Sequence, residues 1–296
     1  MSENHSPRAG LIAAFFALCI WTGFILVSRY GGKGVLTGWD VTALRFGVGS
    51  LIALFFLPRV TLPPLKVTLL FSLFGGVGYA VTVYAAFRMA PAAHAAVLLP
   101  GSLPFSTAVI AWLWLHQRPT PQQRIALILV FIGISFTAAD TFSHGTHLTG
   151  LQLFGDLLYF CGSAIWAVFT LLLRRHPVPP LTAAVSTTLG SAILYLPVWW
   201  LFLPSTMAHA PVAEIAIQAV YQGILVVFVA MLLYAFAVRS LGAQTVTLLM
   251  ALVPCLASVA AVPVLGEPLT LYTVAGLSAV TIGAILGARI TRPRPA

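Results

Sequence analysis

Residues 10–29 read GLIAAFFALCIWTGFILVSR, and residues 155–174 read GDLLYFCGSAIWAVFTLLLR. Both stretches are almost wholly apolar and have the length of about 20 residues that an α-helix needs to cross a bilayer. At an offset of 145 they share Gly10, Phe15, Ile20, Trp21, Phe24, Leu26 and Arg29 with Gly155, Phe160, Ile165, Trp166, Phe169, Leu171 and Arg174. The pair therefore predicts two membrane-spanning helices in equivalent places of a repeated chain.

A second series of matches occurs at an offset of 150. It includes Tyr84, Pro104, Thr120 and Gly133, which match Tyr234, Pro254, Thr270 and Gly283. Coincidences of Ala and Leu are common in an apolar chain, whereas Tyr, Pro and Gly in register are much rarer. We therefore interpret the chain as two repeats, residues 1–145 and 146–296.

The composition excludes a soluble globular protein. Of 296 residues, 60% are hydrophobic and 7% are charged, and the mean hydropathy is +1.01. A soluble domain has roughly a quarter of its residues charged. The net charge of +9 does not indicate nucleic-acid binding, because the basic residues stand singly or in pairs between apolar runs. Cys19, Cys161 and Cys255 have no metal-ligand spacing, so we expect no metal and no cofactor.

Apolar runs bounded by charged residues, Gly or Pro predict ten spans, at residues 10–29, 39–57, 66–88, 91–115, 122–139, 151–173, 180–203, 213–238, 241–265 and 269–290. Lipid offers the backbone no hydrogen-bond partner, so these spans should be helices, and the alternation of a membrane barrel is absent. The predicted fold class is an all-α integral membrane protein. Each repeat has five spans, an odd number, so the repeats should cross the membrane in opposite directions, as in many secondary transporters.

The distribution of Lys and Arg predicts the orientation. With the N-terminus inside, the inner side holds eleven basic residues, Arg8, Arg59, Lys66, Arg118, Arg124, Arg174, Arg175, Arg239, Arg289, Arg292 and Arg294. The outer side holds three, Arg29, Lys33 and Arg88. We therefore expect a multi-pass protein of the bacterial inner membrane with both termini in the cytoplasm.

Three segments resemble the drug/metabolite transporter superfamily of the EamA type. Residues 11–30 are similar to its first helix, VTALRFGVGSLIAL at 41–54 to its second, and residues 251–290 to its last two, with the turn Gly266-Glu267-Pro268-Leu269-Thr270. The first repeat departs from the pattern, because His116-Gln117-Arg118-Pro119-Thr120 stands where a Gly-Glu-x-Pro turn is usual. The resemblance implies a ten-helix exporter of small metabolites, most similar to the YddG-like exporters of aromatic and neutral amino acids.

Arg45 is a basic residue well inside a predicted span. A charge at the bilayer centre costs about 2.5–3.5 kcal/mol on insertion scales, so it needs a partner or a way out. Two interpretations stay open. Arg45 either reaches the outer surface, toward Asp40, or contacts a substrate carboxylate and acts in gating.

His94 and Gln244 occupy equivalent positions in the first turns of the fourth and ninth spans. Free N–H groups at a helix start favour a substrate carboxylate there. The alternative is that the two side chains form hydrogen bonds between helices. We interpret His94 as a candidate for contact with the translocation path.

Aromatic residues form the other candidate lining of a substrate cavity. Trp21 and Trp166 lie at the centres of equivalent spans, away from the interfaces where Trp accumulates, and Tyr79, Tyr84 and Tyr234 also lie within spans. They either stack on apolar parts of a substrate or pack between helices. We expect the cavity between the first, third, fourth, sixth, eighth and ninth spans, with the fifth and tenth at the periphery.

Pro104 and Pro254 interrupt equivalent spans near their middles and act either as hinges or as static kinks. The glycine cluster 75–78 is either a close-packed or a flexible stretch. The motif Gly283-x-x-x-Gly287 predicts close packing within a monomer or in a weak homodimer.

Other acidic residues are expected to be peripheral. Asp140, His144 and His147 are interpreted as a solvated outer loop, and Asp156 as a cap at a helix start. No well-buried carboxylate is expected within the membrane.

The chain lacks G-x-S-x-G, H-E-x-x-H and paired acids of the D-x-x-D type, so an intramembrane enzyme is the weakest hypothesis. We expect a secondary transporter that exports amino acids by alternating access. A multidrug exporter of cationic compounds is the alternative. The sequence leaves the energy coupling open, between proton antiport and facilitated diffusion.

Overall fold

The computed structural model describes residues 7–116, 121–143, 149–241 and 243–288. Within these ranges the chain is helical, without strands. The helices are α1 (Pro7–Lys33), α2 (Gly38–Phe56), α3 (Leu65–Phe71), α4 (Gly78–Met89), α5 (Ala92–Ala96), α6 (Leu103–Leu115), α7 (Pro121–Ser143), α8 (Thr149–Arg175), α9 (Pro180–Phe202), α10 (Val212–Val220), α11 (Ala230–Leu241), α12 (Ala243–Met250), α13 (Val253–Leu265) and α14 (Leu271–Ala288).

Several helices continue one another, and together they form ten rods that coincide with the ten predicted spans. Three wider π-helical stretches join α3 to α4, α5 to α6 and α10 to α11, namely η2 (Ser72–Val77), η3 (Val97–Gly101) and η5 (Tyr221–Val229). Short 3₁₀ turns occur at η1 (Leu57–Arg59) and η4 (Met207–His209). In the described part, seven helical segments are long and apolar enough to cross a membrane, and Val253–Leu265 and Leu271–Gly283 are shorter apolar helices.

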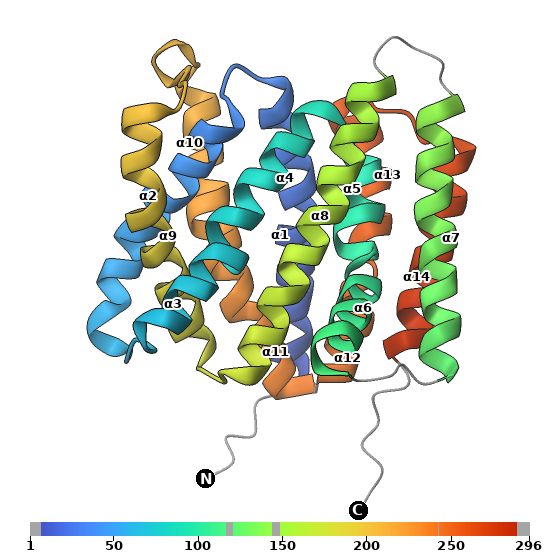
Figure 1. Cartoon of the computed structure of the whole chain (residues 1–296), viewed down its shortest axis with the longest axis horizontal. Helices are drawn as coiled ribbons and strands as arrows, with labels where there is room; N and C mark the ends of the chain where they lie inside the picture. Colours follow the sequence, from blue (N-terminus) through green and yellow to red (C-terminus); the bar gives the residue numbers. More distant parts are fainter. Residues whose placement is uncertain (1–6, 117–120, 144–148, 242, 289–296) are drawn as a thin grey trace, which may run out of the picture.

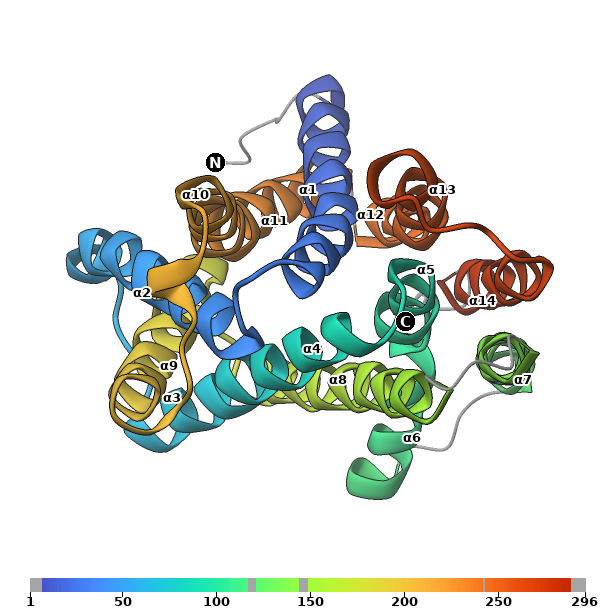
Figure 2. The same cartoon turned by 90° about the horizontal axis from the view of Figure 1, so that it is seen from above.

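The rods stand side by side as one bundle (Figure 1). The start of α1 and the end of α14 lie at the same end, as an even number of crossings requires. The opposite end, where α1 gives way to α2 and α13 to α14, is called the far end here. Seen from above, α7 and α14 form a pair at one edge, and α2, α3 and α9 lie at the other (Figure 2).

Prolines mark breaks in two rods at equivalent positions. Pro104 stands in the first turn of α6, directly after η3, and Pro254 stands in the first turn of α13, after the break that follows α12. Proline tolerates this place because the first N–H groups of a helix have no intrahelical partner. Each of the two prolines therefore begins a new helix and does not kink a continuous one.

The glycine cluster 75–78 has a structural explanation. Gly76 has φ −117° and ψ −106°, which breaks the helical path inside η2. A Cβ atom on Gly75 would lie about 2.5 Å from the ring of Phe169, and one on Gly76 would collide with Ser191 Oγ. The cluster thus combines a kink with close helix packing, as small residues do in membrane proteins.

The two turns that the sequence aligns at an offset of 150 share a backbone conformation. His116 ends α6 with φ 54°, and Gly266 ends α13 with φ 67°. Glycine takes this left-handed conformation without strain, whereas His116 is the non-glycine residue of the described chain that adopts it. The first repeat therefore keeps the helix end of the Gly-Glu-Pro turn without its glycine.

Candidate functional site

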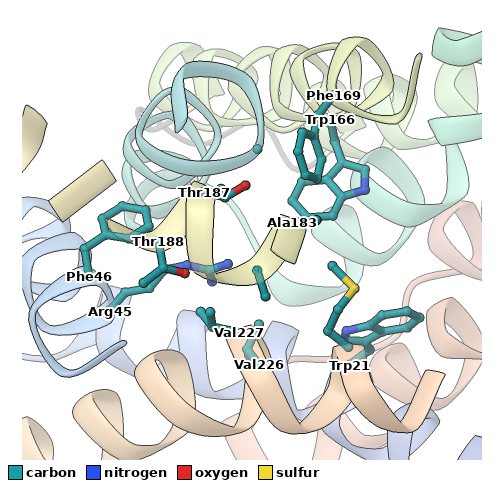
Figure 3. Close-up of a pocket in the computed structure, with 13 residues that line it drawn as sticks. Trp21, Arg45, Phe46, Trp166, Phe169, Ala183, Thr187, Thr188, Val226 and Val227 are labelled. Atoms are coloured by element: carbon teal, nitrogen blue, oxygen red, sulfur yellow. The ribbon is translucent and has the colours of Figure 1, made fainter. Parts of the chain in front are cut away.

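A pocket of about 70 Å³ lies at the centre of the bundle, enough for a few water molecules. It is enclosed by α1, α2, η2, α8, α9, η5 and α11. Figure 3 shows its wall, with Arg45 and Phe46 on one side and two tryptophans on the other. The lining residues are Trp21, Arg45, Phe46, Gly75, Trp166, Phe169, Ala183, Ala184, Thr187, Thr188, Val226, Val227 and Met231.

Arg45 is 6% exposed and lines this pocket. Its Nη1 donates to the hydroxyl of Tyr84 at 3.1 Å, and its Nε has no hydrogen-bond partner among the described residues. Asp40 instead forms the capping box of α2 with Thr37 and accepts from Ser205. The expectation that Arg45 reaches the surface toward Asp40 is therefore wrong, because other donors occupy that carboxylate and Arg45 points into the bundle.

A polar ladder continues from Arg45 into α1. Tyr84 donates to Gln222 Oε1 at 3.0 Å, and Gln222 Nε2 donates to Ser28 Oγ at 3.1 Å. One turn earlier, Gln218 Nε2 donates to the carbonyl of Val27 at 2.8 Å. Each amide is fully buried, so the ladder holds the guanidinium in place through satisfied hydrogen bonds.

Sequence reasoning missed this ladder, although a signal for it exists. Glu214, Gln218 and Gln222 are spaced by four in an otherwise apolar rod, which places them on one helical face. Glu214 accepts from the backbone N–H groups of Val35 and Leu36, at 3.2 and 3.0 Å. A polar stripe in a membrane helix faces protein or water and does not face lipid.

Trp21 and Trp166, which match each other at an offset of 145, stand on the side of the pocket away from Phe46 (Figure 3). Trp21 packs against Tyr234 with ring centroids 5.2 Å apart, and Trp166 packs against Tyr79 at 4.8 Å. Each indole is thus held by a tyrosine that stands outside the lining. Tyr84 is buried and reaches the pocket through Arg45.

Two polar atoms of the wall have no partner. Arg45 Nε and Thr187 Oγ1 are among the four buried side-chain atoms without a hydrogen bond in the described ranges, together with Thr22 Oγ1 and Ser258 Oγ. Leaving such an atom unpaired costs about 1–3 kcal/mol. The hydrogen-bonding capacity of these two atoms, which belong to residues of the pocket wall, is therefore unused in this structure.

The cavity has a different wall from the one predicted. Among the described side chains, those of the first, third, sixth and eighth spans line it, as expected, but those of the fourth and ninth do not. The second span, through Arg45 and Phe46, and the seventh span, α9, take their places. Apolarity alone cannot separate these spans, because it does not report which neighbours a helix faces.

His94 lies outside the pocket. It is 2% exposed, with Nε2 at 2.9 Å from Asp140 Oδ2 and Nδ1 at 2.9 Å from Asp156 Oδ1. Asp140 is buried in α7 and Asp156 lies two turns into α8, so the interpretations as a solvated loop and a helix-start cap are wrong. His144 and His147 lie outside the described residues, as does the side chain of Gln244.

All five acidic residues in the described part of the chain are buried, so the expectation of no buried carboxylate is wrong too. They are Asp40, Asp140, Asp156, Glu214 and Glu267. None of them lines the pocket. Each lies in a far-end turn or within about two helical turns of the far end. A lone acid at the edge of an apolar run is the signal that could have found Asp140 and Asp156.

An ion pair connects α1 to the turn after α13 at the far end. Arg29 Nε and Lys33 Nζ lie 2.6 and 2.9 Å from Glu267 Oε1, and the N–H of Ala92 donates to Glu267 Oε2 at 2.8 Å. Burial by itself would raise the pKa of the Glu267 carboxyl, but the charge of Arg29 and these hydrogen bonds outweigh it and lower the pKa below its usual value.

Comparison with known proteins identifies the class. The sequence profile of the EamA-like transporter family matches residues 8–139 and 153–288. These ranges cover both halves and nearly all of the described helices. The chain belongs to the EamA-like transporter family.

Individual relatives agree with this class. The chain is 25% identical over 201 residues to the uncharacterized transporter YyaM of Bacillus subtilis (strain 168), covering 66% of this chain and 64% of that protein. It is 29% identical over 177 residues to the uncharacterized transporter YvbV of the same organism, covering 59% and 56%. The match thus spans less than two thirds of either relative. The family and both relatives are named as transporters and not as enzymes.

A solved structure shows the same fold. A chain described as "Crystal structure of protein" superposes with a TM-score of 0.63 at 18% identity, covering 97% of this chain and 99% of that chain. At this identity the likeness concerns the fold alone.

Proposed function

We propose that this EamA-family transporter is a secondary exporter of small metabolites, namely amino acids with aromatic or neutral side chains. The central pocket is the substrate site, and transport follows alternating access between two inverted five-helix halves. The observation that carries the proposal is Arg45, a buried guanidinium on the pocket wall with an unpaired Nε. Of the two hypotheses for Arg45, we therefore adopt contact with a substrate carboxylate.

Arg45 suits a carboxylate. A guanidinium presents planar, forked donors that match a carboxylate in pairs. Tyr84 occupies one Nη donor and orients the group from behind. The hydroxyls of Thr187 and Thr188 stand on the same wall (Figure 3), where an amino group can find an acceptor. A zwitterion therefore finds both signs of partner without meeting a fixed carboxylate.

The rest of the wall suits an apolar or aromatic side chain. Trp21, Trp166, Phe169 and Phe46 supply rings, and Val226 and Val227 supply branched aliphatic surface. Aromatic pairs gain about 0.5–1.5 kcal/mol beyond the burial of their area. This composition favours an aromatic amino acid over a strongly polar one.

The alternative, a multidrug exporter of cations, fits the wall less well. Within the described chain, the lining contains a positive charge and no acidic residue. A cation would have to enter beside Arg45 without a counter-charge, which is unfavourable in a low dielectric. The buried acids are already engaged at the far end, by Arg29, His94 and backbone N–H groups.

The size of the pocket supports alternating access. About 70 Å³ is far below the roughly 300–1,000 Å³ of pockets that hold drug-sized ligands. The helices around it must separate before an amino acid enters. The ion pair of Arg29 with Glu267 joins α1 to the turn after α13, and in this proposal it must break when the far end opens.

A substrate panel in proteoliposomes tests the proposal. Proteoliposomes with the purified protein are loaded with one labelled amino acid each, namely phenylalanine, tryptophan, leucine, alanine or glutamate. Efflux of phenylalanine should be the fastest and efflux of glutamate the slowest. Ethidium and tetraphenylphosphonium should not be transported. The reason is that the guanidinium of Arg45 binds the carboxylate of the substrate, while the aromatic residues of the wall contact its side chain.

A matched variant controls this experiment. Trp166→Ala should reduce the preference for phenylalanine over alanine, whereas Trp200→Ala, at a side chain 78% exposed at the bundle surface, should not. Transport of the two cations without transport of any amino acid would sink the proposal.

We further propose that both termini face the cytoplasm, that the far end faces outward, and that the protein works as a monomer or weak homodimer in a bacterial inner membrane. The excess of basic residues on the inner side supports this orientation. A reporter enzyme that is active only in the cytoplasm should be active when it is fused to either end of the chain. A reporter that is active only in the periplasm should be inactive at both ends. Activity of a periplasm-dependent reporter at one end would contradict the orientation.

A further inference from the structure

The triad of Asp140, His94 and Asp156 joins three helices at the far end. His94 in α5 places one ring nitrogen against each carboxylate, at 2.9 Å on both sides, and all three residues are at most 6% exposed. The triad lies outside the pocket and belongs to none of its lining helices except α8. The proposed substrate chemistry does not use it.

The geometry of the triad requires a bound proton. A neutral imidazole has one N–H donor and one bare nitrogen. Two carboxylates facing the two nitrogens can both be hydrogen-bonded only when a further proton is present, either on the ring or on one carboxyl. Without it, a carboxylate oxygen would face a nitrogen lone pair at 2.9 Å in a buried site, which is repulsive.

The triad is also connected to the turn that closes the far end. The hydroxyl of Thr270 donates to Asp140 Oδ1 at 2.6 Å. In the same turn, Glu267 binds Arg29 of α1 and the N–H of Ala92 at the start of α5. The turn 266–270 is therefore held from two sides, by the triad and by the ion pair.

The other charged or titratable groups described near the triad make contacts of their own at the far end. From α1 they are Arg29 and Lys33, from α4 Arg88, from α8 Tyr159, and from the turn Glu267. Arg88 donates to the carbonyl of Leu36, and Tyr159 donates to the carbonyl of Ala90. Glu267 has a lowered pKa, so it stays ionised wherever ordinary carboxylates do.

We propose that the Asp140–His94–Asp156 triad is a proton-binding site whose occupancy locks the far end closed. When the far end opens, water reaches the triad and the proton leaves the imidazole or carboxyl to that water. When a proton returns, both carboxylates regain a donor and α5, α7, α8 and the turn 266–270 come together again. The inference rests on the proposed alternating access, but its test needs no substrate.

Spin labels measure the opening directly. Cysteines at Tyr30 in α1 and Leu271 at the start of α14, both exposed, carry the labels in protein whose Cys19, Cys161 and Cys255 are serines. The distance distribution in lipid nanodiscs is recorded between about pH 5 and about pH 10, a range that covers the ordinary titration of imidazole. A single linked proton shifts the closed-to-open ratio by up to about tenfold per pH unit, so the longer distance should grow as the pH rises.

An isosteric variant separates a proton site from a structural contact. In Asp156→Asn the amide can donate to Nδ1 while Nε2–H donates to Asp140, so neutral His94 is satisfied without a proton. This variant should stay closed across the pH range. In His94→Gln the amide nitrogen can replace one ring nitrogen, but the amide oxygen then faces the other carboxylate, so the open population should rise at every pH. His209→Gln, at an exposed residue of η4, should behave as the wild type.

The outcomes decide between the two proposals. A wild-type distribution that does not change with pH, or an Asp156→Asn variant that opens with pH as the wild type does, overturns the proton site. If His94→Gln does not fold, the comparison of the wild type with Asp156→Asn still decides. Failure of the amino-acid panel overturns the proposed substrate and leaves this result unaffected.

Discussion

Replacing Arg45 by glutamine is expected to lower kcat/KM for phenylalanine exchange by more than about 30-fold. Truncating one partner of a buried, hydrogen-bonded charge pair costs about 2–5 kcal/mol, and each 1.4 kcal/mol is tenfold. Tyr84 occupies one Nη donor of Arg45, and Nε has no partner among the described protein atoms, so the remaining donors of the guanidinium are available to the substrate carboxylate. Arg45→Lys keeps the positive charge but loses the forked donors of the guanidinium, so its kcat/KM should lie between those of the wild type and Arg45→Gln.

The same substitution should not destabilise the protein. A buried guanidinium without a carboxylate partner costs free energy, and glutamine removes that charge while keeping a donor for Tyr84. Thermal unfolding of the purified Arg45→Gln variant should therefore occur at the wild-type temperature or above. Arg59→Gln is the matched control, because Arg59 is exposed and lies 4.7 Å above the Phe55 ring. Wild-type exchange by Arg45→Gln would show that Arg45 does not contact the substrate.

Replacing Gly133 by leucine is expected to cause the largest loss of stability. A Cβ atom on Gly133 would lie 2.7 Å from the carbonyl oxygen of Gly276, and one on its repeat counterpart Gly283 would lie 2.9 Å from the carbonyl of Ala126. Both obstacles are backbone atoms, so α7 and α14 would have to move apart. Overpacking costs about 1–3 kcal/mol in well-packed cores, and the added Leu atoms beyond Cβ place this variant at the upper end.

Thermal unfolding in detergent measures the effect, with Gly283→Leu as a second variant. Gly47→Leu is the control, because a Cβ atom on Gly47 would meet nothing within 4 Å. Since Gly283 packs against α7 of the same chain, the molecular mass in solution should be the same for Gly283→Leu and the wild type. Equal unfolding temperatures for Gly133→Leu and Gly47→Leu would contradict the close packing of α7 and α14.

The number and bounds of the helices were predictable because their cause is local. Hydrocarbon rejects unpaired backbone groups and charges, so each crossing is a continuous apolar run with polar residues at its ends. The observed bounds differ from the predicted ones by at most four residues, as for α1 and α7. The breaks at Pro104 and Pro254 were likewise visible, because proline acts on its own helix.

The partners of the polar residues were not predictable. Arg29 and Glu267 are 238 residues apart in the chain, and Tyr84 and Gln222 are 138 apart. A pair of this kind forms only when two helices meet with particular faces toward each other. Apolarity does not specify that rotation, since a membrane helix is apolar on the side that faces lipid and on much of the side that faces protein.

By itself, the sequence determined that this chain is a membrane protein of ten helical rods, because transfer from water to lipid is decided segment by segment. It also singled out Arg45, His94 and the two central tryptophans, because polar and amphipathic side chains are unusual at these places inside membrane-spanning helices. Only the tertiary structure decided that Arg45 and the tryptophans share one pocket while His94 stands apart between Asp140 and Asp156. The physical reason is that a buried charge is stabilised by whichever group the packing of distant helices brings within about 3 Å of it.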